Sequence, residues 1–134
     1  MPITFALDHA ARKIIATATG PVAYTEIIDH LKAEERSNCL SYSELLVATD
    51  ATADFSPAEV RWIVEFLRGI GRAHALGKTA MVVRNEITYG MLRMLSILLE
   101  EIVETAVFRN KTEAVEWLGW QLTDDTQLTG EIGP

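Results

Sequence analysis

The stretch SELLVATDATADFSPAEVRWIVEFL, residues 43–67, carries the clearest fold signals in the chain. Its apolar run at 45–48 is typical of a strand buried on both faces, and the polar residues 49–54 predict a turn. Residues 56–59 then supply an N-cap serine, a proline at the first helical position and a capping-box glutamate. Strand, turn and helix in this order predict an α/β fold. Because open α/β sheets bind ligands past the carboxyl ends of their strands, this turn is the first candidate site.

The composition is that of one globular domain. A chain of 134 residues can bury one good core but not two, and 49% hydrophobic residues are enough to form it. The formal net charge of −7 would repel a phosphate backbone, so nucleic-acid binding is not expected. One cysteine, Cys39, and three histidines scattered along the sequence, His9, His30 and His74, do not predict a zinc site. We expect no metal and no cofactor.

The same composition bears on location. The sequence has no run of about 18 uncharged apolar residues, so no membrane span is expected. The first residues, MPITFALDHA, lack the basic and long apolar segments of a signal peptide. Because a single cysteine also suits a reducing compartment, a cytoplasmic location is predicted.

The remaining elements follow from hydrophobic periodicity and capping signals. The predicted strands are 3–7, 13–19, 45–48, 79–83 and 105–108. The predicted helices are 22–35, with Pro21 at its first turn, then Ser56 to a terminator at Gly77, then 86–102 and 111–120. The domain is predicted to cover residues 1–120, and residues 121–134 are predicted to form a loose polar tail.

The order β-β-α-β-α-β-α-β-α defines the expected topology. The short link between the first two strands predicts an antiparallel hairpin. From the second strand onward strands and helices alternate, which predicts parallel strands with helical crossovers. We therefore expect a mixed, mostly parallel sheet of four or five strands, with helices on both faces.

Asp50, Thr52 and Ser56 are the candidate residues after the third strand. As a turn residue and an N-cap, Asp50 and Ser56 would need no further role. Alternatively, a phosphate here would meet free N–H groups and the helix dipole. Since phosphorylation of Ser56 would destroy its cap, Thr52 is the better acceptor. Both interpretations stay open.

Arg84, Asn85 and Tyr89 follow the fourth strand and are expected beside the same turn. A functional interpretation makes them a polar crevice in which Arg84 clamps an anion. The structural alternative is that Asn85 caps the next helix, Tyr89 is half-buried, and Arg84 is solvated or paired with Asp50. The structural alternative is favoured, because capping alone accounts for Asn85.

The helix predicted at 86–102 is apolar over most of its circumference, so it should be covered on more than one side. The expected buried face is Ile87, Met91, Met94, Leu95, Leu98 and Ile102. The last helix would cover it, as would a second copy in a homodimer. A third alternative is a cavity for a lipid or another small apolar ligand, lined by the adaptable side chains of Met81, Met91 and Met94.

Three segments together resemble a known group of proteins. They are LLVATDATADFSPAEVRWIVEFLRG (45–69), GKTAMVVRNEITYGMLRML (77–95) and AVFRNKTEAVEWL (106–118). The chain resembles the SpoIIAA-like proteins of the STAS superfamily over residues 3–118. This resemblance implies a (βα) superhelix, a fold that is also seen in Sec14-type lipid-transfer domains.

The resemblance also guides the expected function. Anti-sigma-factor antagonists of the superfamily carry an Asp-Ser-Ser-Gly-type motif with a phosphorylated serine after the third strand. Here Asp50 is followed by Ala51-Thr52-Ala53, so that switch is not carried over. No phosphate-binding glycine loop or nucleophile motif occurs either, and an enzyme is not expected. The expected function is a non-enzymatic regulatory or protein-interaction module. The alternative is binding of a lipid or another small apolar ligand in a Sec14-like cavity.

Overall fold

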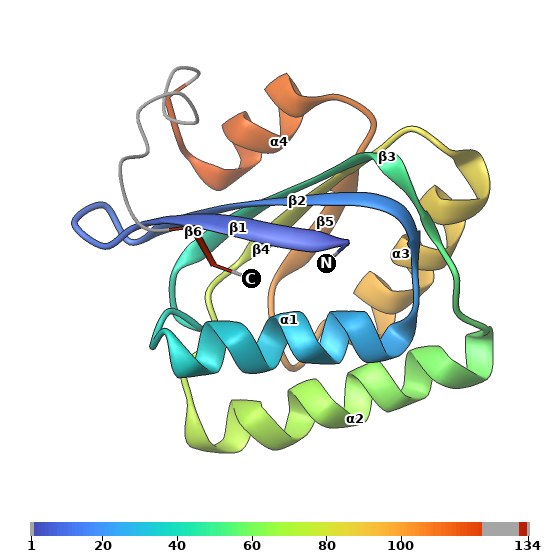
Figure 1. Ribbon diagram of the computed structural model, residues 1–134, viewed down its shortest axis with the longest axis horizontal. Coiled ribbons are helices and arrows are strands. Elements are labelled where there is room, and N and C mark those ends of the chain that lie inside the picture. Colours follow the sequence, from blue (N-terminus) through green and yellow to red (C-terminus); the bar gives the residue numbers. More distant parts are fainter. Residues whose placement is uncertain (1, 122–131, 134) are drawn as a thin grey trace.

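A mixed β-sheet lies at the centre of the computed structural model, which describes residues 2–121 and 132–133 (Figure 1). The elements are β1 (Ile3–Asp8), β2 (Lys13–Val22), α1 (Tyr24–Arg36), β3 (Ser43–Ala53), α2 (Pro57–Ala73), β4 (Thr79–Val83), α3 (Glu86–Leu98), β5 (Thr105–Phe108), α4 (Lys111–Leu118) and β6 (Ile132–Gly133). The strand order is β5-β4-β3-β2-β1-β6. Strands β2 to β5 are parallel and β1 is antiparallel to β2, as predicted.

Helices cover both faces of the sheet. Helices α1, α2 and α3 lie on one face and α4 on the other (Figure 1). The larger core lies under the first three helices and includes Phe5, Ile63 and Leu99. The smaller core, with Leu45 and Leu118, lies under α4. Strands β3 and β4 are therefore buried on both sides, which explains why their sequences are continuous apolar runs.

The first boundary that differs from the prediction is the end of β2. The strand does not stop at Thr19 but continues through Gly20, at φ +70°, and Pro21 to Val22. Pro21 is therefore a strand residue, and its predicted place in the first turn of a helix is wrong. Helix α1 begins at Tyr24 instead, because the Glu26 side chain accepts a 2.8 Å hydrogen bond from the Ala23 amide and caps that end.

The end of β3 also lies further along the chain than predicted. Strand β3 runs to Ala53, so Asp50 and Thr52 are strand residues and the predicted turn at 49–54 is wrong. The cause is the extension of β2, which pairs with β3 after an irregularity between Thr17 and Thr19. A strand with a partner can continue through polar residues, because the backbone hydrogen bonds are satisfied by the ladder.

The helix starts are predicted well and the ends less well. Ser56 accepts a 3.2 Å hydrogen bond from the Glu59 amide, which confirms the capping box of α2. Helices α2, α3 and α4 all end two to four residues before their expected limits at 76, 102 and 120. Gly77 lies beyond α2 and does not terminate it.

The buried face of α3 also differs from the expected one. It consists of Thr88, Leu92 and Leu95, whereas Ile87 and Leu98 are exposed. Strongly apolar side chains of α3 project on nearly every side of the helix, so periodicity alone cannot select the face that packs on the sheet.

The C-terminal residues add a short strand that was not predicted. Residues 132–133 form β6, which pairs antiparallel with β1 at the edge of the sheet. The rest of the predicted tail, residues 122–131 and 134, lies outside the described residues.

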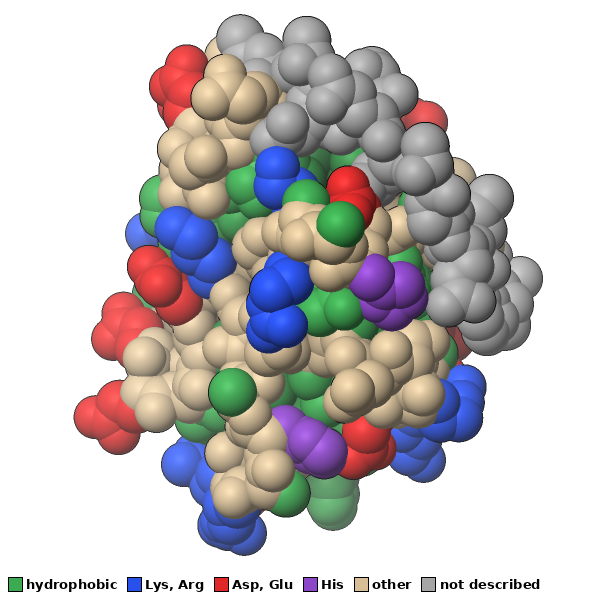
Figure 2. Space-filling view, turned by 90° about the vertical axis from the view of Figure 1, so that its left-hand side faces the viewer, with side chains coloured by type: hydrophobic (Ala, Val, Ile, Leu, Met, Phe, Trp, Pro, Cys, Tyr) green, Lys and Arg blue, Asp and Glu red, His purple; other side chains and the backbone are tan. Residues whose placement is uncertain are grey.

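Two further observations concern the helices and one face of the surface. No helix among the described residues is long and apolar enough to cross a bilayer. Acidic and basic side chains are interspersed on the face that carries the β1–β2 turn, without a broad basic area (Figure 2).

Candidate functional site

The residues predicted after β3 and β4 lie on an exposed surface. Asp50 and Arg84 form an ion pair with 3.5 Å between Oδ1 and Nη1, and both side chains are more than 70% exposed. Thr52 is exposed nearby on the same strand as Asp50. An ion pair so open to solvent contributes little to stability and would hold an anion weakly.

Capping and packing account for the other predicted residues. Ser56 caps α2, and the Asn85 side chain accepts a 2.9 Å hydrogen bond from the Thr88 amide to cap α3. Tyr89 is half-buried with the Arg109 guanidinium 4.1 Å from its ring centroid. These contacts support the structural interpretation of the residues, and no described cavity unites all six.

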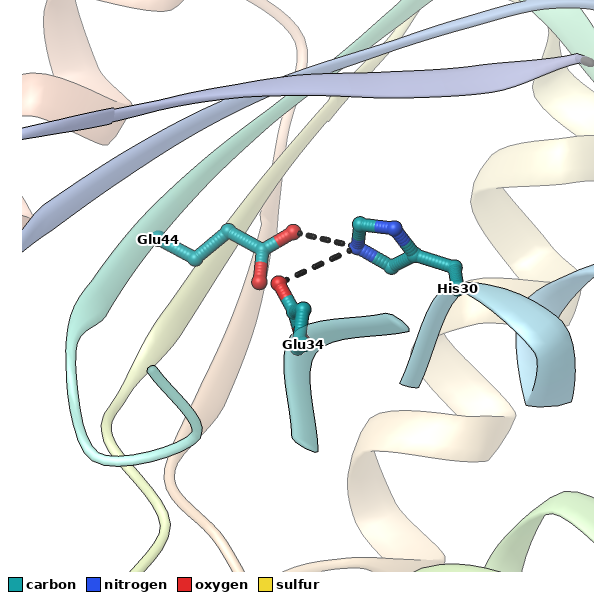
Figure 3. A group of neighbouring side chains, drawn as sticks. All are labelled: His30, Glu34 and Glu44. Carbon is teal, nitrogen blue, oxygen red and sulfur yellow. Dashed lines mark hydrogen bonds and ion pairs between the residues drawn. The ribbon is translucent and has the colours of Figure 1, made fainter. Parts of the chain in front are cut away.

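A different group of polar side chains is buried beneath the sheet. His30 and Glu34 come from α1 and Glu44 from the start of β3 (Figure 3). His30 Nε2 lies 2.9 Å from Glu44 Oε2 and 3.2 Å from Glu34 Oε2. The three side chains are at most 7% exposed. Because burial of charged groups is costly unless they are paired, this cluster is the most unusual chemical feature of the described structure.

Local sequence explains how the three side chains meet. Ile27, His30, Leu31 and Glu34 follow the i, i+3, i+4, i+7 spacing that places residues on one helix face. That face packs toward the sheet, so its two polar members are carried inside with the two apolar ones. Glu44 lies two residues before Leu46 along β3, so both side chains point to the same face of the sheet, the face that α1 covers.

The cluster shifts the ionisation of its members. For His30 burial lowers the pKa, but Coulombic attraction to Glu44 and the closeness of both carboxyl groups outweigh it and raise the pKa to about 10. Burial and repulsion by Glu44 raise the pKa of Glu34 well above its usual range. Burial tends to raise the pKa of Glu44, but attraction to His30 outweighs this effect and holds the pKa below its usual value. At neutral pH an imidazolium therefore faces the Glu44 carboxylate, and the raised pKa of Glu34 biases that group toward its neutral form.

The hydrogen bonding of the cluster is incomplete. A protonated His30 Nε2 carries one hydrogen, which it donates to Glu44, although two carboxyl oxygens face the nitrogen (Figure 3). Glu34 Oε2 and His30 Nδ1 have no hydrogen-bond partner among the described residues. Each of the three residues also offers one metal-ligating atom, and these atoms lie within 4.8 Å of one another.

The cluster lines an apolar cavity of about 100 Å³. The other walls are mainly aliphatic, and they include Leu31 of α1, Leu67 of α2, Leu95 of α3, Leu46 of β3 and Met81 of β4. Met91 and Met94, which were predicted to line such a cavity, pack against the larger core instead. An apolar enclosure with a few converging polar groups is the usual form of a small-molecule site.

This cavity lies at the opposite end of the strands from the predicted site. Its lining includes Glu44, Thr79 and Thr105, which lie at or beside the first residues of β3, β4 and β5. The prediction placed function at the carboxyl ends of the strands and so missed it. One signal was present in the sequence: two polar residues four positions apart, His30 and Glu34, interrupt the apolar face of α1.

Comparisons with known proteins bear on the fold. No family model and no curated protein matches the chain. A solved structure of an uncharacterised DUF3478-family protein from Shewanella loihica, described as having a SpoIIAA-like fold, is similar to it with a TM-score of 0.53. The two are 17% identical, and the match covers 87% of this chain and 93% of the other. The resemblance seen in the sequence is confirmed at the level of architecture: the chain has a SpoIIAA-like α/β fold.

Proposed function

We propose that the chain is a non-enzymatic binding module for a small, largely apolar molecule that carries one polar group. The observation that carries this proposal is the apolar cavity with His30, Glu34 and Glu44 at its wall. Aliphatic side chains would hold the apolar part of the ligand, and the cluster would bind its polar group. Occupancy of the cavity would then serve as the regulatory signal.

The size of the cavity limits the ligand. A dry protein cavity of about 150 Å³ accepts benzene, so a volume of about 100 Å³ suits a molecule smaller than benzene and admits a benzene-sized ring only if the walls move apart. A whole lipid would exceed this volume, whereas one end of a chain would not. Of the two ligands expected for a Sec14-like cavity, a small apolar molecule fits this volume and a whole lipid does not.

Filling the cavity should abolish binding. We expect Leu95→Phe to weaken binding of phenol at least about tenfold, because the larger ring takes up space that the ligand needs. Phenol is the probe because it joins one apolar ring to one hydroxyl group, at the upper limit of the size that the cavity could admit. Titrations followed by amide chemical shifts would measure binding and locate it around His30 and Leu95.

The matched control is Leu118→Phe. Leu118 is about as buried as Leu95, at 6% against 5% exposure, but it belongs to the smaller core on the other face of the sheet. The control should bind phenol like the unmodified chain. Equal losses in both variants, or phenol shifts remote from the cavity in the unmodified chain, would refute the proposed site.

A second candidate function, a protein-interaction module, is favoured by the open edge of β5. This strand is the last in the sheet order, and a groove of about 330 Å³ runs along it beside Ile97 and Trp117. Ile97 is 56% exposed. An open strand edge beside exposed apolar side chains can pair with an extended segment of a partner.

Two isoleucines of α3 allow this second function to be tested. A partner identified by crosslinking in the native host should bind Ile97→Lys at least about tenfold more weakly, because a buried lysine amine would be unpaired in the groove. Ile87→Lys is the control, since Ile87 is even more exposed but does not line the groove. Calorimetry with the purified partner would measure both, and equal affinities would argue against the β5 edge.

A further inference from the structure

We propose that His30, Glu34 and Glu44 form a binding site for a divalent transition-metal ion of the Zn²⁺ class. The ligand atoms would be His30 Nε2 and one carboxylate oxygen from each glutamate. This site is a separate inference from the small-molecule site above, because metal binding requires only these three side chains.

The convergence of the three side chains is the first support. In a tetrahedral zinc site with bonds of about 2.0–2.2 Å, neighbouring ligand atoms lie about 3.3–3.6 Å apart. The distances from His30 Nε2 to the nearest oxygens of Glu44 and Glu34 are 2.9 Å and 3.2 Å. The imidazole nitrogen would therefore need to move away from each of these oxygens by only a few tenths of an ångström to admit an ion.

The second, independent support is the unpartnered oxygen of Glu34. Glu34 is only 3% exposed. Its Oε2 points at His30 Nε2 but accepts no hydrogen bond (Figure 3). The single N–H of His30 Nε2 is donated to Glu44, so it leaves Glu34 Oε2 without a donor. An ion between the three groups would use a lone pair from each of them at once.

The donor set and the surroundings indicate the class of ion. Two carboxylates balance the charge of a divalent ion, which matters in a site with apolar walls. Imidazole nitrogen together with carboxylate oxygen suits Zn²⁺ and similar ions, whereas Mg²⁺ prefers oxygen ligands and keeps several waters. A cavity of about 100 Å³ lined mainly by aliphatic side chains has little room for such a hydration shell.

One feature lowers the expected affinity. Histidines that bind metals usually donate their other ring N–H to an acceptor, and loss of that partner costs about 10–100-fold in affinity. His30 Nδ1 has no acceptor among the described residues, and the edge of Phe5 contacts the ring instead. We therefore expect weaker binding than at a dedicated structural zinc site. The three side chains leave one tetrahedral position for a group that enters from the cavity.

The test is a titration of the chelator-treated chain with ZnCl₂, MnCl₂ and MgCl₂, followed by native mass spectrometry and calorimetry. We expect one Zn²⁺ per chain, bound more tightly than Mn²⁺ and far more tightly than Mg²⁺. His30→Gln should weaken Zn²⁺ binding about 100-fold or more, because losing a ligand should exceed the loss of a group that only orients one. Glu34→Gln should weaken it at least about tenfold by the same reasoning.

Surface histidines provide the control. His9 and His74 are exposed, and histidine side chains are visible on the face shown in Figure 2. His74 lies 3.0 Å from Glu35, an exposed pair that could hold zinc adventitiously. The variant His74→Gln should leave Zn²⁺ binding unchanged. Loss of binding in His74→Gln, or retention of full affinity in both His30→Gln and Glu34→Gln, would overturn the proposal.

A second measurement does not depend on the variants folding. Two-dimensional NMR of the histidine ring nitrogens in the unmodified chain should show the Nε2 signal of one buried histidine moving on addition of Zn²⁺, while the two exposed histidines stay in place. Zinc should also raise the thermal midpoint, and the rise should continue with the logarithm of the free Zn²⁺ concentration once the site is filled. Movement of only the exposed histidines, no stoichiometric binding, or tighter binding of Mg²⁺ than of Zn²⁺ would each contradict the site.

Discussion

Replacing His30 with alanine is expected to lower the free energy of unfolding by about 3–5 kcal/mol. The substitution removes the cation that faces both buried carboxyl groups, so Glu44 is left as an uncompensated charge under the sheet. It also removes the ring that meets the edge of Phe5, with ring centroids 5.3 Å apart. Urea denaturation followed by circular dichroism, in buffer with a chelator, would measure the loss.

A triple variant distinguishes the destabilisation caused by removing one member of the cluster from the net contribution of the whole cluster to stability. His30→Leu, Glu34→Met and Glu44→Met together replace the polar cluster with apolar side chains of similar volume. Such replacements are often neutral or stabilising, because the desolvation cost of the charges also disappears. We expect the triple variant to be at least as stable as the unmodified chain within about 1 kcal/mol. A triple variant as unstable as His30→Ala would contradict this account.

Such a result would have a functional meaning. A cluster that stability does not require is available for another role, and binding is the role proposed above. The stability experiment and the zinc titration therefore use the same residues to answer different questions.

Replacing Gly77 with alanine should also destabilise the fold strongly, by about 3 kcal/mol. A Cβ atom at this position would lie 2.0 Å from the carbonyl oxygen of Tyr42. The Gly77 amide is fixed there by a 2.8 Å hydrogen bond to the Leu40 carbonyl. Since the obstacle is backbone, the segment before β3 would have to move. That segment carries Tyr42 and leads directly into Glu44, so the cavity wall would move with it.

Gly69 is the matched control for Gly77. It lies inside α2, and a Cβ atom there would meet nothing within 4 Å. Gly69→Ala should therefore stabilise the chain by up to about 1 kcal/mol, because alanine is the better helix former. Urea midpoints of the two variants should shift in opposite directions. A shift of the same sign and size in both would show that the approach of Tyr42 does not constrain Gly77.

Much of the architecture could be predicted because its signals are local. The apolar runs of β4 and β5 and the caps at Ser56, Asn85 and Asn110 depend on residues within a few positions of one another. The extended ends of β2 and β3 could not be predicted in the same way. Polar residues such as Asp50 and Thr52 stay in a strand because a partner strand lies beside them, and that partner is distant in sequence.

The candidate site also combines local signals, which the sequence shows, with contacts between distant residues, which it does not show. His30 and Glu34 were close in sequence and their spacing on an apolar helix face was visible, but nothing in the sequence linked them to Glu44. The predicted residues, including Asp50 and Arg84, do come together at the carboxyl ends of the strands, yet as an exposed pair. The general tendency of α/β sheets to bind ligands at those ends does not lead to the cavity that holds His30, Glu34 and Glu44, which lies at the opposite ends of the strands.

By itself the sequence determined the order of elements from β1 to α4, the starts of α2, α3 and α4, and the apolar character of the central strands, because these depend on short-range periodicity and capping. Only the tertiary structure decided which face of α3 is buried, where β2 and β3 end, and that a histidine and two glutamates meet beneath the sheet. The physical reason is that packing α1 against β3 joins residues 14 positions apart in a low-dielectric interior. Their charges, hydrogen bonds and shared cavity exist only once that interior has formed.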